Sequence, residues 1–110
     1  MKDNHKKYIE RTFYLANKGL GNVSPNPMVG CVIVKAGKII GESYHKEYGK
    51  EHAEINAINT VVDKSQLKGS SFYINLEPCS HHGKTPPCSD EIIKYKPKEV
   101  IISNLDQNPI

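Results

Sequence analysis

Residues 28–34 read MVGCVIV, a continuous apolar run that is too short for a typical helix. The run therefore predicts a buried β-strand. Residues 35–38 turn the chain, and the apolar residues that follow at 39–41 predict a second strand, antiparallel to the first. These two strands form a hairpin on which the rest of the predicted fold is built.

Apolar periodicity elsewhere predicts helices over residues 8–18, 53–62 and 88–95, and further strands over residues 72–76 and 100–102. The order helix, two strands, helix, strand, helix, strand is typical of an α/β domain. We expect three layers, α/β/α, with helices covering a central mixed sheet. The last two strands should run parallel, joined by a right-handed crossover through the short helix.

Length and composition indicate one lean domain. The chain has 110 residues, and its apolar fraction of 37% is low for a globular protein. Such a domain is expected to depend on a bound metal, a subunit partner or further sequence. The chain ends at residues 106–110, directly after a predicted strand, which would leave an open sheet edge. We therefore expect one domain over residues 1–110, truncated at its C-terminus, that forms a homo-oligomer of two or more subunits.

Charge and cysteine content narrow the class of protein. The net charge is +3, and the lysines are scattered along the sequence. This pattern indicates a solvated surface rather than a surface that binds nucleic acid. Residues 1–7 are polar and resemble neither a signal peptide nor a membrane span, so a cytoplasmic location without membrane attachment is expected. Three cysteines, an odd number, argue against a disulfide framework and leave thiols available to metal.

Four residues in two clusters suggest zinc chemistry. His52 and Glu54 flank one alanine, and Cys79 and Cys88 each follow a proline. One imidazole and two thiolates can hold zinc with a fourth position open, which distinguishes catalytic zinc from structural zinc. A carboxylate beside such a site can carry protons for a hydrolytic reaction. The pattern predicts hydrolysis at an electrophilic carbon, with removal of an amino group.

The spacing of His52 and Glu54 restricts where they can lie. On an ideal helix, residues two apart point about 200° away from each other, so the pair could not face one metal from mid-helix. They can do so if His52 lies at the helix entry, where the backbone is not yet helical. The positive end of that helix would also stabilise thiolates, and Cys88 is predicted to open a helix in the same way.

Other interpretations of these residues exist. A closed structural zinc site would need a fourth protein ligand, for which His81, His82 and His45 are candidates. Cys31 lies inside the apolar strand and is expected to be a core thiol rather than a ligand. His5 is expected to be a solvated residue of a polar tail.

Longer motifs resemble those of known enzyme families. His52, Glu54 and Cys79 match the zinc deaminase signature, but eight residues separate the cysteines where that signature usually has two. The sequence EPCSHHGKTPPC at residues 77–88 closely resembles the diaminohydroxyphosphoribosylaminopyrimidine deaminases of riboflavin biosynthesis. The sequences SPNPMVGCVIV at 24–34 and DQNP at 106–109 resemble further motifs of that family, the latter with one change.

The resemblance implies a cytidine-deaminase-like fold and a phosphorylated pyrimidine as substrate, which loses an amino group as ammonia. It implies one Zn²⁺ per chain, with His52, Cys79 and Cys88 as ligands and Glu54 as the catalytic proton carrier. It also implies that the substrate is contacted by Asn26, His45 and Lys84. In many bacteria such a deaminase precedes an NADPH-dependent reductase on one chain, so NADPH would be a cofactor only if that domain exists.

Two alternatives remain open at this point. The chain could deaminate another base, such as cytosine, guanine or the adenosine of transfer RNA, although the loop between Cys79 and Cys88 argues against this. It could also be an inactive module that zinc stabilises for binding or structural purposes.

Overall fold

A computed structural model describes residues 3–19, 21, 28–46, 52–75 and 88–103, with the backbone alone for residues 3, 4, 88 and 89. Three α-helices, one 3-10 helix and four strands make up this part of the chain. In chain order they are α1 (Asp3–Asn17), β1 (Gly30–Lys35), β2 (Lys38–Tyr44), α2 (Ala53–Thr60), η1 (Lys64–Leu67), β3 (Ser71–Ile74), α3 (Cys88–Lys94) and β4 (Glu99–Ile102).

The strands form one mixed sheet in the order β2-β1-β3-β4. Strand β1 pairs antiparallel with both β2 and β3, whereas β3 and β4 run parallel. The predicted hairpin and the predicted parallel pair are therefore both confirmed. Ala36 and Gly37 connect β1 to β2 and both have positive φ, at 52° and 78°, as a tight two-residue hairpin turn requires.

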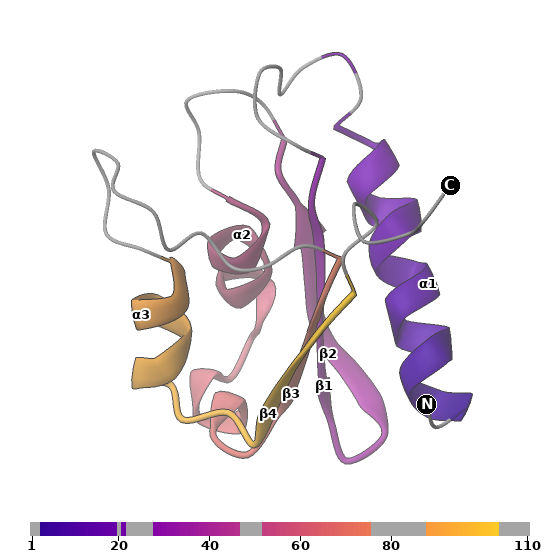
Figure 1. The fold of residues 1–110 in the computed structure, drawn as a ribbon. Coiled ribbons are helices and arrows are strands. Elements are labelled where there is room, and N and C mark those ends of the chain that lie inside the picture. Colours follow the sequence, from indigo (N-terminus) through magenta and orange to yellow (C-terminus); the bar gives the residue numbers. More distant parts are fainter. Residues whose placement is uncertain (1–2, 20, 22–27, 47–51, 76–87, 104–110) are drawn as a thin grey trace.

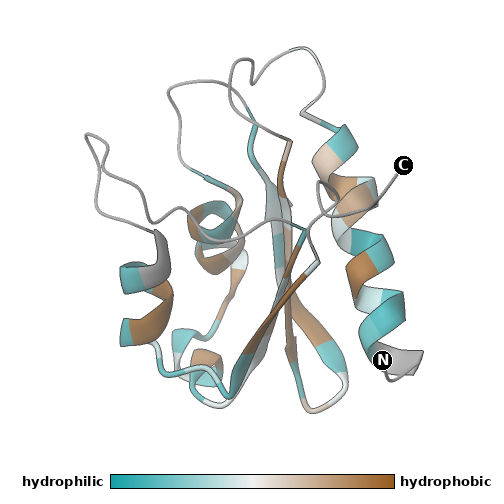
Figure 2. Ribbon diagram, in the orientation of Figure 1, coloured by the Kyte–Doolittle hydropathy of each residue, from teal (hydrophilic) through white to brown (hydrophobic). Residues whose placement is uncertain are grey.

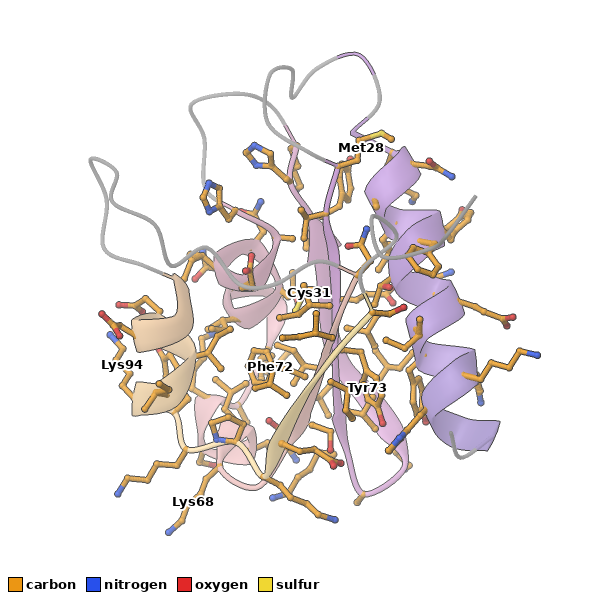
Figure 3. All side chains as sticks on the ribbon, viewed as in Figure 1. Met28, Cys31, Lys68, Phe72, Tyr73 and Lys94 are labelled. Carbon is orange, nitrogen blue, oxygen red and sulfur yellow. The ribbon has the colours of Figure 1, made fainter. Side chains whose placement is uncertain are left out.

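Helices cover both faces of the sheet, so the predicted three layers are confirmed. Figure 1 shows α1 on one face and α2 with α3 on the other. Successive strand residues alternate between the faces. Phe72 packs in the cluster under α2 and α3, and Tyr73 packs in the cluster under α1, as Figure 3 shows. The strands are mostly hydrophobic in Figure 2, whereas α1 mixes both kinds of residue.

Two glycines let helices approach the sheet at backbone distance. A Cβ atom on Gly30 would overlap the carbonyl oxygen of Thr12 and lie 3.0 Å from the backbone nitrogen of Ala16, both in α1. A Cβ atom on Gly41 would lie 2.6 Å from a methyl group of Val61, directly after α2. The absence of a side chain at each position thus sets how closely α1 and α2 pack on the hairpin.

The first helix is longer than predicted. Helix α1 begins at Asp3, not residue 8, because a tertiary contact stabilises its polar first turns. The ring of His5 packs edge-on against Tyr73 with 5.5 Å between ring centroids, and Tyr8 lies 5.1 Å from the same ring. The expectation that His5 is merely solvated was therefore wrong. Helix η1 was not predicted; Asp63 caps it by accepting a hydrogen bond from the backbone of Ser65.

An ion pair fastens α1 to the edge strand β2. The guanidinium of Arg11 donates two hydrogen bonds to the carboxylate of Glu42, at 2.9 and 2.6 Å. These bonds favour the charged carboxylate, so they lower the pKa of Glu42 below its usual 4.5. Within the described part of the chain, no helix is both long and apolar enough to cross a membrane.

Replacing Gly30 with alanine should destabilise the protein by about 2 kcal/mol or more, because the added Cβ has no space beside α1. The free energy of unfolding from urea titration measures this. Gly37→Asn is the matched control, since nothing lies within 4 Å of its added Cβ and asparagine tolerates positive φ. Equal losses for both variants would contradict the packing argument.

Replacing Arg11 with methionine should produce a pH-dependent loss of stability. The folded pKa of Glu42 lies below its unfolded value, so the pair stabilises the fold above pH 4.5 and this contribution disappears as the pH falls through the folded pKa. Because the Arg11 side chain is 40% exposed, solvent screening limits the loss at neutral pH to about 0.5–1 kcal/mol. Urea titrations across this pH range measure it.

The more exposed pair of Lys94 and Glu91 provides the control for this experiment, with Lys94→Met expected to cost less. A loss in the Arg11 variant that does not change with pH would show that packing, rather than charge, holds α1 to β2.

Candidate active site

The predicted site residues come from segments that meet at one edge of the sheet, namely the edge formed by the ends of the strands rather than by an outer strand. Strands β2, β3 and β4 end at this edge, and the antiparallel strand β1 begins there. In Figure 1 it is the upper edge, and α2 and α3 also begin on this side. Ligands commonly bind where strand ends meet helix starts in α/β sheets. This edge is therefore the candidate active site.

Helix α2 begins as the zinc hypothesis requires. His52 is its N-cap residue, with extended backbone angles of φ −75° and ψ 168°, and its carbonyl oxygen accepts a hydrogen bond from the backbone nitrogen of Asn56 at 3.0 Å. Glu54 lies in the first turn of the helix, and only 2% of its surface is exposed. The prediction that His52 stands at a helix entry is confirmed.

His45 lies directly against His52. It follows the last residue of β2, is 2% exposed, and its backbone nitrogen donates a hydrogen bond of 2.9 Å to the carbonyl oxygen of Val29. The two imidazole rings are perpendicular, with centroids 5.1 Å apart. The structure therefore brings together His45, His52 and the start of the helix that carries Glu54.

Two asparagines that sequence reasoning missed hold these segments in place. The side-chain nitrogen of Asn56 donates a hydrogen bond of 2.9 Å to the carbonyl oxygen of Tyr44, which ties α2 to the end of β2. Asn75, directly after β3, bonds to the backbone on either side of Val29. The available signal was an asparagine between the apolar residues of α2, and another directly after an apolar strand.

The structure describes only part of the predicted ligand set. Cys88 is the first residue of α3, as predicted, but its side chain is not described. Asn26, Cys79 and Lys84 lie outside the described residues, so their roles stay predictions. Cys31 has no exposed surface and belongs to the core cluster under α2 and α3, which confirms that it is a core residue.

Comparison with protein families decides the class. The family model of the cytidine and deoxycytidylate deaminase zinc-binding region matches residues 2–104. The chain belongs to this family. A diaminohydroxyphosphoribosylaminopyrimidine deaminase from Buchnera aphidicola subsp. Schizaphis graminum is 56% identical over 99% of this chain and 71% of its own length.

Solved structures agree with the family assignment. The Acinetobacter baumannii protein RibD superposes with a TM-score of 0.87 at 40% identity, over 96% of this chain and 29% of that protein. A Thermotoga maritima protein, described as a diaminohydroxyphosphoribosylaminopyrimidine deaminase and 5-amino-6-(5-phosphoribosylamino)uracil reductase, superposes with a TM-score of 0.84 at 48% identity, over 90% of this chain and 29% of that protein. The predicted cytidine-deaminase-like fold is thereby confirmed, and the chain spans less than a third of these two proteins.

Replacing His52 with alanine should abolish stoichiometric zinc binding, because it removes the one nitrogen ligand of the predicted set. Metal analysis of purified, reduced protein measures the zinc content. His5→Ala is the control, since His5 lies in the first turns of α1 against Tyr73, on the other face of the sheet from α2, and its loss should leave zinc unchanged.

His45→Asn, His81→Asn and His82→Asn test whether the site has a fourth protein ligand. Zinc retained in all three variants supports three protein ligands, whereas zinc lost from one of them would make that histidine a fourth ligand and the site structural. Zinc retained in the His52 variant would contradict the ligand assignment itself.

Proposed function

We propose that this protein hydrolyses an amino group from a diaminopyrimidinone that carries a phosphoribosylamino group, giving the corresponding aminouracil and ammonia. The observation that carries the proposal is 56% identity to the Buchnera deaminase over almost the whole chain. The start of α2, with the half-buried His52 and the buried Glu54, supplies the chemistry such a reaction needs. By this proposal the reaction is an early step of riboflavin biosynthesis.

The proposal assigns residues 1–110 a deaminase domain and no reductase activity. The Thermotoga protein is described as a deaminase and a reductase, but this chain spans only 29% of that protein. NADPH would therefore enter only with a reductase domain outside these residues. A homo-oligomer, expected from the lean composition and the open sheet edge, stays a prediction.

A zinc ion would be held by His52, Cys79 and Cys88. One imidazole and two thiolates form the donor set that suits zinc with an open position. The described part of the site fits this group, because His52 lies at a strand-end edge with its backbone still extended and with another imidazole beside it. When bound, zinc supplies Lewis acidity, which makes water acidic enough to act as a nucleophile near neutral pH.

Glu54 would move the protons. Hydrolysis forms a bond from the oxygen of water to the amidine-like ring carbon and breaks the bond from that carbon to the amino nitrogen. Glu54 would accept one proton of the attacking water and pass it to the ring nitrogen, and would then carry the remaining proton, from the new hydroxyl group, to the departing amine. Its burial in the first turn of α2 keeps bulk water from competing for these protons.

Substrate contacts are assigned to Asn26, His45 and Lys84. His45 is buried at the same edge as His52 and Glu54, so a base bound there would meet its ring. Lys84 is suited to an oxygen or phosphate group of the substrate, and Asn26, which precedes β1, is suited to hydrogen bonds with a base edge.

Replacing Glu54 with glutamine should reduce ammonia release from the phosphorylated diaminopyrimidinone by about 100-fold or more, because the amide cannot carry protons. Zinc content should stay stoichiometric, since Glu54 is not assigned as a ligand. Glu10→Gln is the matched control on the exposed face of α1 and should retain full turnover.

Cytosine and guanine nucleotides serve as competing substrates in the same assay. Turnover of either base in preference to the diaminopyrimidinone would overturn the proposed substrate. Unchanged turnover in the Glu54 variant would overturn the role of Glu54, and an inactive wild-type protein with full zinc would favour a binding or structural module.

A further inference from the structure

We infer that Asn75 is a positioning residue for the active site: its side chain fixes the backbone before β1 and, through it, the buried His45. The inference rests on the proposed function in one respect, namely that His45 contacts the substrate. It adds a residue that neither the motifs nor the comparisons identify.

Asn75 makes two hydrogen bonds across the sheet edge. Its side-chain oxygen accepts from the backbone nitrogen of Gly30 at 2.7 Å, and its side-chain nitrogen donates to the carbonyl oxygen of Met28 at 3.2 Å. Asn75 is 2% exposed; its bond to Gly30 is buried and its bond to Met28 is partly buried. One partner is a donor and the other an acceptor, and the carboxamide of Asn75 satisfies both because it carries an oxygen that accepts and a nitrogen that donates.

These bonds continue the pairing of β1 with β3 beyond its last backbone rung. The last pair of that ladder is Cys31 with Ile74, so Gly30 and Asn75 are next in line. The carboxamide takes the place of a main-chain partner at that position. It thereby joins the start of β1 to the end of β3 at the edge that forms the candidate active site. We call this pair of hydrogen bonds the clamp.

The clamp reaches His45 through one residue. Val29 lies between the two residues that Asn75 holds, and its carbonyl oxygen accepts the hydrogen bond from the backbone nitrogen of His45 at 2.9 Å. A shift of residues 28–30 would therefore move His45, whose ring packs on His52. Figure 3 shows Met28 at the upper edge of the sheet.

Among the described residues, Asn75 is connected more directly to His45, on the predicted substrate side, than to the predicted ligand His52. Its bonds run to the start of β1, where Val29 holds the backbone of His45, whereas His52 is placed by the start of α2. Loss of the clamp should thus weaken substrate binding more than metal binding. Misplacement of a substrate-positioning group by about 1 Å can cost 100-fold in rate.

The test uses two variants of Asn75 and one control in the full chain. Asn75→Leu keeps the approximate volume and removes both bonds, whereas Asn75→Asp keeps an acceptor for Gly30 and loses the donor to Met28. Ser70→Ala is the control: it removes one buried side-chain bond, to the carbonyl oxygen of Leu67, where β3 begins at the opposite edge of the sheet.

In the leucine variant we expect KM for the diaminopyrimidinone to rise about tenfold or more, with stoichiometric zinc and a smaller change in kcat. The KM of the aspartate variant should lie between those of the leucine variant and the wild type, and Ser70→Ala should keep the wild-type KM. Backbone hydrogen exchange gives a second readout: the amide of Gly30 should exchange at least about tenfold faster in the leucine variant and stay protected in the control.

An unchanged KM in both Asn75 variants, or the same KM change in Ser70→Ala, would overturn the inference. If the leucine variant does not fold, the KM and the Gly30 hydrogen exchange of the aspartate variant test the inference instead. A wild-type protein that lacks deaminase activity would refute the proposed function instead. In that case, unchanged exchange at Gly30 in the Asn75 variants would separately refute the clamp.

Discussion

Backbone groups that extend past the last rung of a sheet must still find hydrogen-bond partners when they are buried, and this requirement shapes the candidate active site. At the edge where β1 begins, the carbonyl oxygen of Val29 accepts a hydrogen bond from the backbone nitrogen of His45. The side chain of Asn75 accepts a hydrogen bond from the backbone nitrogen of Gly30 and donates one to the carbonyl oxygen of Met28. The same bonds that satisfy the backbone also bring the segments of three strands into register. Catalytic geometry at this edge is thus a by-product of completing the sheet.

Close packing of helices sets the rest of the site. Gly30 and Gly41 allow α1 and α2 to lie on the hairpin at backbone distance, which would be impossible with any side chain at those positions. The position of α2 then determines where its first turn, with His52 and Glu54, meets the sheet edge. Helix α1 contributes no assigned site residue; its contribution is to cover the opposite face, held by Arg11 and Glu42.

Sequence reasoning predicted the elements whose signal is local. The hairpin, the parallel strand pair and the helix entry at His52 followed from apolar runs and from the spacing of two residues. The first turns of α1 could not be predicted, because the contact of His5 with Tyr73 joins residues far apart in the chain. The clamp by Asn75 was missed for the same reason, since its partners lie 45 and 47 residues away.

The central claim is that a zinc ion with one imidazole and two thiolate ligands lies at this sheet edge and leaves a coordination position open. X-ray absorption at the zinc edge on the purified, reduced protein tests it most directly. We expect two sulfur neighbours at about 2.3 Å and two nitrogen or oxygen neighbours at about 2.0 Å, one of the latter from solvent. A shell of four protein ligands, or one without sulfur, would contradict the account.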